Sequence, residues 1–353
     1  MKKVLLILAA LALLGSGYYL ATSHTTSAQA ASHSNLTGIA FIAGHGGHLA
    51  MINLADMKSP TDIQDDRVVI TEPGSEMEGT VAGLHIEDVK RQGGIHGSAL
   101  IGQKLYVGML DGSVVTYDLA TGVESKKVKV GSKFCDAVIG PGGKHIYFED
   151  MADGHVYEFD YKTMKLADKI PVGASVCGIQ WTKNRKYAYV SGMPDGTVYV
   201  LDWKTKKIVQ KIHDDSMTFL HQIRMTPDGK QLWVTSGNEF DPGLKPGTHT
   251  PEIVVIDTAT NKIIDHIMMP GMGVHDVVFS PDGNTALVTE RDYGHRDSSL
   301  ILMDAKTHEV QKKISVCYSC HGNYGIKVRM DNGDPLLCGL TVAWGMKQKP
   351  KMY

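Results

Sequence analysis

The sequence predicts an all-β fold, a β-propeller of four-stranded blades, and three observations support it. Glycine is abundant, at 38 residues, while aromatic residues make up only 7% of the chain, which suits short strands joined by tight turns. Similar segments recur with a period of roughly forty residues, the signature of a repeat architecture. Each segment holds four apolar or alternating runs separated by Gly, Pro, Asp or Lys-Thr turns, and such units close radially into a propeller.

The clearest unit spans Gly273 to Ile314, and an earlier one spans Leu220 to His266. Both contain a Pro-Asp-Gly turn, at residues 227–229 and 281–283, which favours a hairpin between the first two strands. Three further units begin at Ile95, Phe134 and Val176. The sequence therefore predicts five full units.

A partial unit lies at each end of the repeat region. Gly38–Thr71 contains three predicted strands and Tyr324–Val342 contains two. We expect N-terminal and C-terminal strands to share one blade that closes the ring. This gives six to eight blades, with seven favoured. The segments at 72–92, 237–251 and 290–298 depart from the repeat and are predicted loop insertions.

The N-terminus predicts export. Lys2 and Lys3 precede an apolar run from Val4 to Leu14, and Ala28-Gln29-Ala30 follows, which together are typical of a cleaved secretory signal. The run from Val4 to Thr22 is also apolar enough to remain as an uncleaved anchor. Residues 1–30 are thus a predicted signal peptide or anchor, and residues 31–353 a single propeller domain. The domain is expected to be periplasmic or extracellular, with membrane contact only through an uncleaved N-terminus.

Composition excludes one class of partner. Hydrophobic residues make up 42% of the chain, charged residues 21%, and the net charge is −2. These values are typical of a soluble globular protein. No basic stripe or RNA-binding motif is present, so nucleic acid is not an expected partner.

One motif carries cofactor chemistry, Cys317-Tyr318-Ser319-Cys320-His321. Two cysteines at this spacing can bind the two vinyl groups of haem, and the adjacent His321 is the expected proximal iron ligand. The alternatives are a buried structural cysteine pair or a redox-active pair, but predicted export favours one covalent haem c. The residues after the motif are predicted strands rather than the helices of a small cytochrome. The haem should therefore contact the propeller, with Met330, Met346 or a propeller histidine as sixth ligand.

Alignment of the units on their first turn places a reactive residue at the start of each first strand. Because first strands line the central channel, we expect these residues to form a ring at one mouth, made of His96, Cys135, Cys177, His221 and His275. Imidazole and thiolate suit iron and copper, so these residues are candidates for the sixth haem ligand or for a second metal. The alternatives are structural histidines and buried thiols. A Cys135–Cys177 bridge is a further alternative, although neighbouring inner strands are expected to be rather far apart for it.

The loops between second and third strands are expected to open on the same face. Arg291 is the candidate there for binding a small inorganic anion, because its guanidinium combines charge with a fork of donors. The neighbouring loop residues are His45, His48, His249, His295 and Arg296.

The repeats resemble a known group. The segments Thr226–Gly229, Ser280–Gly283, Tyr187–Val190 and Val254–Asp257 resemble the YVTN-type propellers. Within that group they are similar to the cytochrome d1-like propeller of cytochrome cd1 nitrite reductase and its relatives. The resemblance implies a tetrapyrrole at the channel mouth, with His96, His221 and His275 as ligand and proton-donor candidates. The c-type motif, however, lies in the last blade and not in a preceding helical domain, which weakens the case for nitrite reduction and for a non-covalent haem d1.

Together these features predict an exported c-type cytochrome that acts in electron transfer or in redox conversion of a small inorganic substrate. Whether it is an enzyme stays open; as a haem-dependent oxidoreductase it would have His96, His221, His275 and Arg291 as candidate catalytic residues. One alternative is a non-catalytic subunit that docks an electron-transfer partner protein. Another is a haem or metal delivery protein that uses the ring of histidines and cysteines.

Overall fold

The computed structural model describes residues 36–44, 48–54, 80–81, 84–85, 95–102, 104–118, 123–173, 175–237, 251–269, 273–292, 297–317 and 337–344. All of its described elements are β-strands, and the strands belong to one unit, residues 37–353. The predicted all-β class is therefore confirmed. No helix among these ranges is long and apolar enough to cross a membrane.

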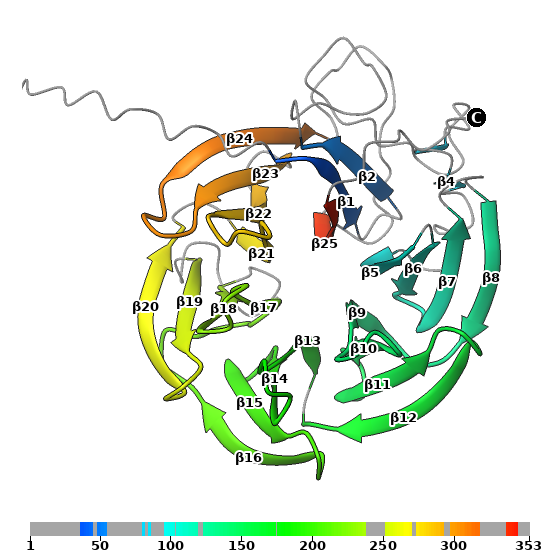
Figure 1. Ribbon diagram of the computed structural model, residues 1–353, viewed down its shortest axis with the longest axis horizontal. Helices are drawn as coiled ribbons and strands as arrows, with labels where there is room; N and C mark the ends of the chain where they lie inside the picture. Colours follow the sequence, from blue (N-terminus) through cyan, green and yellow to red (C-terminus); the bar gives the residue numbers. More distant parts are fainter. Residues whose placement is uncertain are drawn as a thin grey trace, which may run out of the picture. The chain divides into compact units, whose positions relative to one another are not determined.

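Five antiparallel four-stranded sheets form blades around a common centre (Figure 1). In each, the strand order in the sheet follows the chain. The blades are β5 (Ile95–Ile101), β6 (Lys104–Met109), β7 (Ser113–Asp118) and β8 (Val123–Lys129); β9 (Phe134–Ile139), β10 (Ile146–Asp150), β11 (His155–Asp160) and β12 (Lys165–Pro171); β13 (Val176–Trp181), β14 (Tyr187–Gly192), β15 (Thr197–Asp202) and β16 (Lys207–Ile212); β17 (Ile223–Met225), β18 (Gln231–Ser236), β19 (Glu252–Asp257) and β20 (Lys262–Met268); and β21 (Gly273–Phe279), β22 (Thr285–Asp292), β23 (Asp297–Asp304) and β24 (Val310–Cys317).

The two ends of the chain meet in a shared sheet. Strand β25 (Leu337–Trp344) pairs antiparallel with β1 (Gly38–Gly44), and β1 pairs with β2 (His48–Asn53). Strand β25 also contacts β21 and β5, the innermost strands of the last and first four-stranded blades. The predicted closure by N-terminal and C-terminal strands is therefore confirmed.

The described residues do not form the favoured seven blades. The described residues form five four-stranded blades and the three-stranded sheet β2-β1-β25. Beyond the five full units, the expected blades came from the strands of the two partial units, Gly38–Thr71 and Tyr324–Val342. Among the described strands, β3 (Thr80–Val81) and β4 (Leu84–His85), which lie in the predicted 72–92 insertion, form a two-stranded sheet of their own. Strand β25 joins the sheet of β1, so the described strands of the two partial units form one shared sheet.

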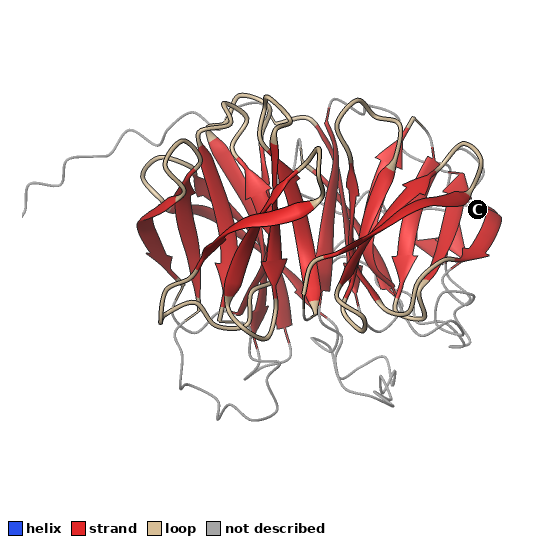
Figure 2. Cartoon of the chain, turned by 90° about the horizontal axis from the view of Figure 1, so that it is seen from below, coloured by secondary structure: helices blue, strands red, loops and turns tan. Residues whose placement is uncertain are grey.

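Burial is greatest in the middle strands of the blades and least in the outermost strands. Every residue of β10 is buried, and β14, β15 and β18 are buried except at one end, because neighbouring blades cover both faces of these strands. The outermost strands β12 and β16 are exposed at nearly every position. These edge strands are rich in lysine, which discourages pairing with another chain. Figure 2 shows the strands running between two faces that carry the loops.

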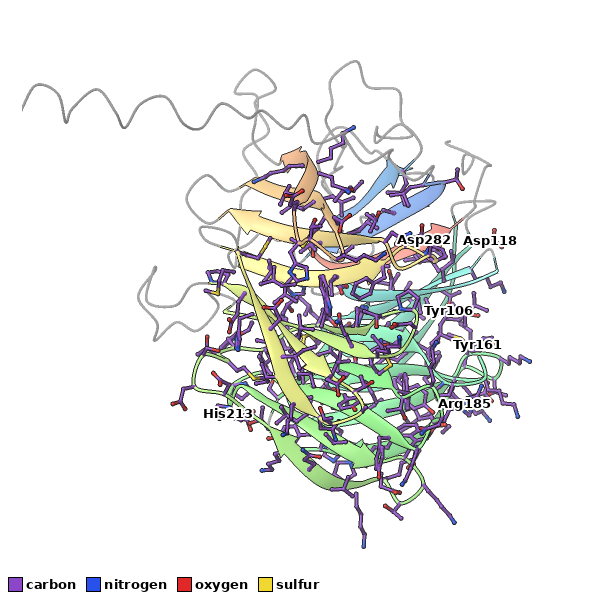
Figure 3. All side chains as sticks on the ribbon, turned by 60° about the vertical axis from the view of Figure 1, so that its left-hand side comes forward. Tyr106, Asp118, Tyr161, Arg185, His213 and Asp282 are labelled. Atoms are coloured by element: carbon purple, nitrogen blue, oxygen red, sulfur yellow. A yellow bond between two sulfur atoms is a disulfide. The ribbon has the colours of Figure 1, made fainter. Side chains whose placement is uncertain are left out.

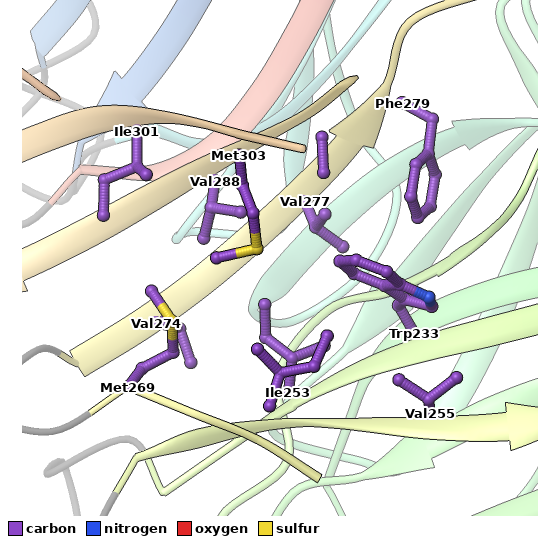
Figure 4. Packing of buried hydrophobic residues seen from close by; sticks show 12 residues of the cluster. Trp233, Ile253, Val255, Met269, Val274, Val277, Phe279, Val288, Ile301 and Met303 are labelled. Carbon is purple, nitrogen blue, oxygen red and sulfur yellow. The ribbon is translucent and has the colours of Figure 1, made fainter. Parts of the chain in front are cut away.

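Apolar side chains fill the space between adjacent blades. Between the last two four-stranded blades, the fully buried Trp233 meets Phe279 edge to face with 4.9 Å between ring centroids, inside a cluster that includes Ile253 and Val288 (Figure 4). Between the first two blades, the rings of Tyr106 and Tyr161 meet edge to face at 5.6 Å (Figure 3). Each blade thus depends on both neighbours for its core.

The first turn of each unit has the same backbone conformation. Gly143, Gly229 and Gly283 have φ angles of 63°, 76° and 71°, in the left-handed region that favours glycine. Arg185 occupies the corresponding place in its unit with φ 58°. The alignment of the units used to define the ring of histidines and cysteines is therefore correct for these four units.

Gly97 marks the closest approach of two inner strands. A Cβ atom at this position would lie 2.4 Å from Cα of Asp136 and 2.5 Å from N of Ala137. Because those atoms belong to the backbone of the next blade, the blade itself has to move to admit a methyl group.

We expect Gly97→Ala to lower the free energy of unfolding by about 3 kcal/mol, the upper end of the usual cost of overpacking. Gly102→Ala is the matched control, because Gly102 has φ 63° but nothing lies within 4 Å of the added Cβ; its cost should be about 1 kcal/mol. Chemical denaturation of the two variants measures the difference. Equal losses would contradict the close packing of β5 on β9.

Candidate channel site

Four of the five predicted ring residues come together at the starts of the inner strands. Cys135 lies on β9, Cys177 on β13, His221 just before β17, and His275 on β21. All four side chains are buried, with at most 3% of any of them exposed. The strands β9, β13, β17 and β21 lie side by side around the centre (Figure 1). The position of these residues at the channel is as the repeat alignment predicts.

Cys135 and Cys177 form a disulfide between adjacent blades. Their Cα atoms are 5.0 Å apart, within the range of about 4.4 to 6.8 Å that disulfides require. The expectation that neighbouring inner strands are rather far apart for a bridge is therefore wrong. The physical reason is the convergence of inner strands toward the axis, which also produces the close approach at Gly97.

His221 connects the cysteine pair to His275. Its Nδ1 lies 3.5 Å from Cys177 Sγ, and its ring centroid is 4.2 Å from that of His275. Phe219, two residues earlier, has φ 50°, a conformation that costs a non-glycine residue roughly 1 kcal/mol or more. Its ring packs 6.1 Å from the His221 ring. Backbone strain at this point accompanies the placement of His221.

Hydroxyl groups on the second strands hold the backbone of the ring residues. Ser191 on β14 donates to the carbonyl oxygen of His221 in the next blade, and Thr235 on β18 donates to the carbonyl oxygen of His275 at 2.8 Å. The same Thr235 oxygen accepts the amide N–H of Gln222 at 2.9 Å. Buried polar backbone atoms are thus satisfied between blades, which fixes the spacing of the histidines.

A layer of charged side chains adjoins the ring. Arg224 on β17 places Nη2 2.9 Å from Asp136 Oδ2 and 3.1 Å from Asp276 Oδ2. The guanidinium is 13% exposed and the two carboxylates at most 2%. Burial alone lowers the pKa of Arg224, but the charges of Asp136 and Asp276 outweigh this and raise it above its ordinary value. One cation therefore connects acids from two other blades.

Gln222 joins the charged layer to the cysteine pair. Hydrogen bonding assigns its amide nitrogen to donate to Asp136 Oδ2 at 2.7 Å and to the carbonyl oxygen of Cys177 at 3.2 Å. The other amide atom, Oε1 in this assignment, lies 3.7 Å from Cys177 Sγ and 3.9 Å from Cys135 Sγ. An amide acceptor therefore faces the two sulfur atoms.

Glu149 on β10 is fully buried beside this layer. Neither of its carboxyl oxygens has a hydrogen-bond partner among the described residues. Burial raises the pKa of Glu149 well above its usual value of 4.5, and the negative charge of Asp136 adds to the effect, while Arg224 opposes it. The folded protein therefore holds Glu149 as a neutral acid over a range of pH where an exposed glutamate is ionised.

The other predicted site residues are placed by the backbone alone or lie outside the described residues. His96 is on β5, and Arg291 is on β22, opposite Gly273 at the start of β21. Cys317 is the last residue of β24, opposite Asp297. Asp297 is in turn opposite Asp292, and the neighbouring Arg291 is opposite Gly273. Cys317 therefore lies at the end of the blade where its inner strand begins. Cys320, His321, Met330 and Met346 fall outside the described ranges.

Comparison with known proteins identifies the same fold and a related domain. Residues 174–327 match the family described as Cytochrome D1 heme domain. The predicted resemblance to cytochrome d1-like propellers is confirmed. The match spans three of the four-stranded blades, β13 to β24, and extends through the Cys317–His321 motif. It supports a haem-type tetrapyrrole cofactor and a redox role.

Among solved structures, the chain is similar to Kuenenia stuttgartiensis Hydrazine Synthase, with a TM-score of 0.50 and 20% sequence identity. The similarity covers 60% of this chain and 62% of that one, and at this identity it supports the fold alone. No curated protein matches the sequence.

Several channel residues were not predicted from the sequence. These are Asp136, Glu149, Gln222, Arg224 and Asp276. Three of them, Asp136, Gln222 and Asp276, directly follow a ring residue in the sequence. Two polar residues in a row at the start of an apolar strand could therefore have indicated that these positions line the channel. Arg224 and Glu149 lack such a pattern, and only the folded ring brings them beside the acids.

Replacing Arg224 should show how strongly the channel depends on this cation. We expect Arg224→Met to lower the free energy of unfolding by about 3 to 5 kcal/mol, because it leaves Asp136 and Asp276 buried without their partner. Lys230→Met is the control, since Lys230 and its partner Asp228 are 80% and 55% exposed and such pairs contribute about 0 to 1 kcal/mol. Denaturant titration measures both; a loss for Arg224→Met as small as that for the control would contradict the role assigned to the pair.

Replacing Glu149 should change how stability depends on pH. A carboxyl whose folded pKa is raised binds its proton more strongly in the folded state, so its contribution is present near its usual pKa of 4.5 and is lost as pH rises through the folded pKa. We therefore expect Glu149→Gln to match the wild type near pH 4 and to become progressively more stable than it at higher pH. Urea unfolding across a pH series tests this, with the exposed Glu309→Gln as control. A difference independent of pH would exclude the neutral acid.

Proposed function

We propose that this protein is an exported c-type cytochrome that transfers electrons through one haem bound covalently to Cys317 and Cys320, with His321 as proximal ligand. The observation that carries the proposal is the Cys-x-x-Cys-His motif within the residues that match the Cytochrome D1 heme domain. Two independent indications of haem chemistry thus coincide in one segment. The N-terminal signal supports export, which covalent attachment outside the cytoplasm requires.

The strand register supports a haem near the channel face. Cys317 ends the outermost strand of the last four-stranded blade, on the face where β21 begins. A haem attached there would supply one-electron exchange at its iron. The backbone of Arg291 lies at the same end of the blade, opposite Gly273. Cys317, for haem attachment, and Arg291, for anion binding, therefore lie on the same face of the blade.

Burial of the ring favours electron transfer over open catalysis. His221 and His275 are 3% and 0% exposed, so they do not line a site that substrate reaches from solvent within the described residues. Electron transfer with a partner protein needs no such access. Redox conversion of a small inorganic anion beside Arg291 is the second candidate, because a guanidinium recognises oxyanions by charge and by paired donors.

Replacing both Cys317 and Cys320 by Ala should abolish covalent haem, because both thioether bonds are then impossible. Denaturing gel electrophoresis with haem staining, together with a pyridine haemochrome spectrum, measures attachment. Cys338→Ala is the control, since Cys338 lies on β25 outside the motif, and it should retain the haem. Covalent haem in the double variant would refute the proposal.

The absorption spectrum then separates the two candidate functions. An electron-transfer haem with two protein ligands should be six-coordinate and low-spin, and should show no change with nitrite, sulfite or hydroxylamine. A five-coordinate or water-ligated haem whose spectrum shifts with one of these compounds would overturn the electron-transfer assignment. It would support redox conversion of that substrate instead.

A further inference from the structure

We propose that Cys135, Cys177 and His221 form a buried copper(I)-binding centre in the propeller channel, opened when the disulfide is reduced. The proposal does not depend on the haem, because its residues come from other blades and carry none of the haem motif. In this proposal the cysteine pair binds a metal ion when reduced and links two blades when oxidised.

The donor atoms are already gathered. The ligand atoms of Cys135, Cys177 and His221 all lie within 4.8 Å of one another, and all three residues are buried. They come from three consecutive blades, and the carbonyl oxygen of His221 is held by Ser191. A metal centre built on a rigid scaffold loses little entropy on binding, so this arrangement is prepared for an ion.

The surroundings favour copper(I) over zinc. Two methionines, Met151 and Met193, pack against the cysteine pair together with Phe219. Thiolate and thioether sulfur are the donors that select copper(I). Structural zinc almost always takes four protein ligands in a tetrahedral set, whereas the gathered group offers two sulfurs and one nitrogen. Three soft ligands with further sulfur nearby therefore fit copper(I) better.

The orientation of Gln222 is compatible with a reduced cysteine pair. Its amide nitrogen is directed to Asp136 Oδ2, which turns the amide oxygen toward both sulfur atoms. A disulfide has no hydrogen to donate to that oxygen, but a thiol does. In this orientation, reduction of the pair supplies the amide oxygen with a thiol donor that the disulfide lacks.

The required redox step balances with a dithiol reductant. Two electrons and two protons pass from the reductant to Cys135 and Cys177, the S–S bond opens to two thiols, and the reductant becomes a disulfide. Copper(I) then replaces thiol protons, which leave to solvent, and is coordinated by the two sulfurs and by His221.

The test uses the full chain with its haem content as purified. The protein is reduced anaerobically with excess dithiothreitol and desalted. Thiol trapping after unfolding then establishes whether Cys135 and Cys177 are reduced. Copper(I) is titrated in competition with a chromophoric chelator, and copper X-ray absorption reports the ligands. We expect one copper(I) per chain in addition to any bound by the variant Cys135→Ser/Cys177→Ser, with sulfur and nitrogen neighbours.

His221→Ala keeps both cysteines and so separates loss of a ligand from loss of the fold. It should weaken copper(I) binding by about 10- to 100-fold, with thiol content and circular dichroism unchanged. The exposed His213→Ala is the matched control and should bind as the wild type does. Equal copper(I) binding by wild type and the double cysteine variant, zinc binding without copper(I) binding, or a pair that dithiothreitol leaves oxidised would each overturn the proposal.

Discussion

The centre of this propeller depends on one buried cation, Arg224. It reaches from β17 to Asp136 on β9 and Asp276 on β21, so a single side chain connects three blades. Removing a charge from water is costly, and the cost is recovered only when every partner is present. A lysine could not replace it, because the guanidinium also donates from Nη1 to the carbonyl oxygen of Ile223 at 3.0 Å and presents its donors in a fixed plane.

Around this cation the channel is divided into two chemical layers. The charged layer contains Asp136, Asp276 and Arg224, with the neutral acid Glu149 beside it. The layer at the starts of the inner strands contains the cysteine pair and the two histidines. Gln222 contacts both layers through its amide group. The hydroxyls of Ser191 and Thr235 keep both layers in register with the blades.

Much of the fold could be predicted because the repeat carries it. The turn at Gly229 and its counterparts fixed the alignment of the units, and that alignment placed Cys135, Cys177, His221 and His275 correctly at the channel. The number of blades could not be predicted in the same way. The sequence of a partial unit is the same whether its strands join the other partial unit in one sheet or form a separate blade. The charged layer was also hidden, because Arg224 meets Asp136 across 88 positions of sequence and a single chain shows no trace of such a pair.

The two proposals assign different redox chemistry to different parts of the ring. A haem at Cys317 would exchange single electrons at the outer edge of a blade, whereas the Cys135–Cys177 pair would exchange two electrons together with protons at the centre. The pair is fully buried, so its reduction requires local opening of the blades that carry β9 and β13. Close packing at Gly97 and the ion pairs of Arg224 oppose that opening. The ion pairs of Arg224 would therefore add to the free energy that reduction of the buried pair requires.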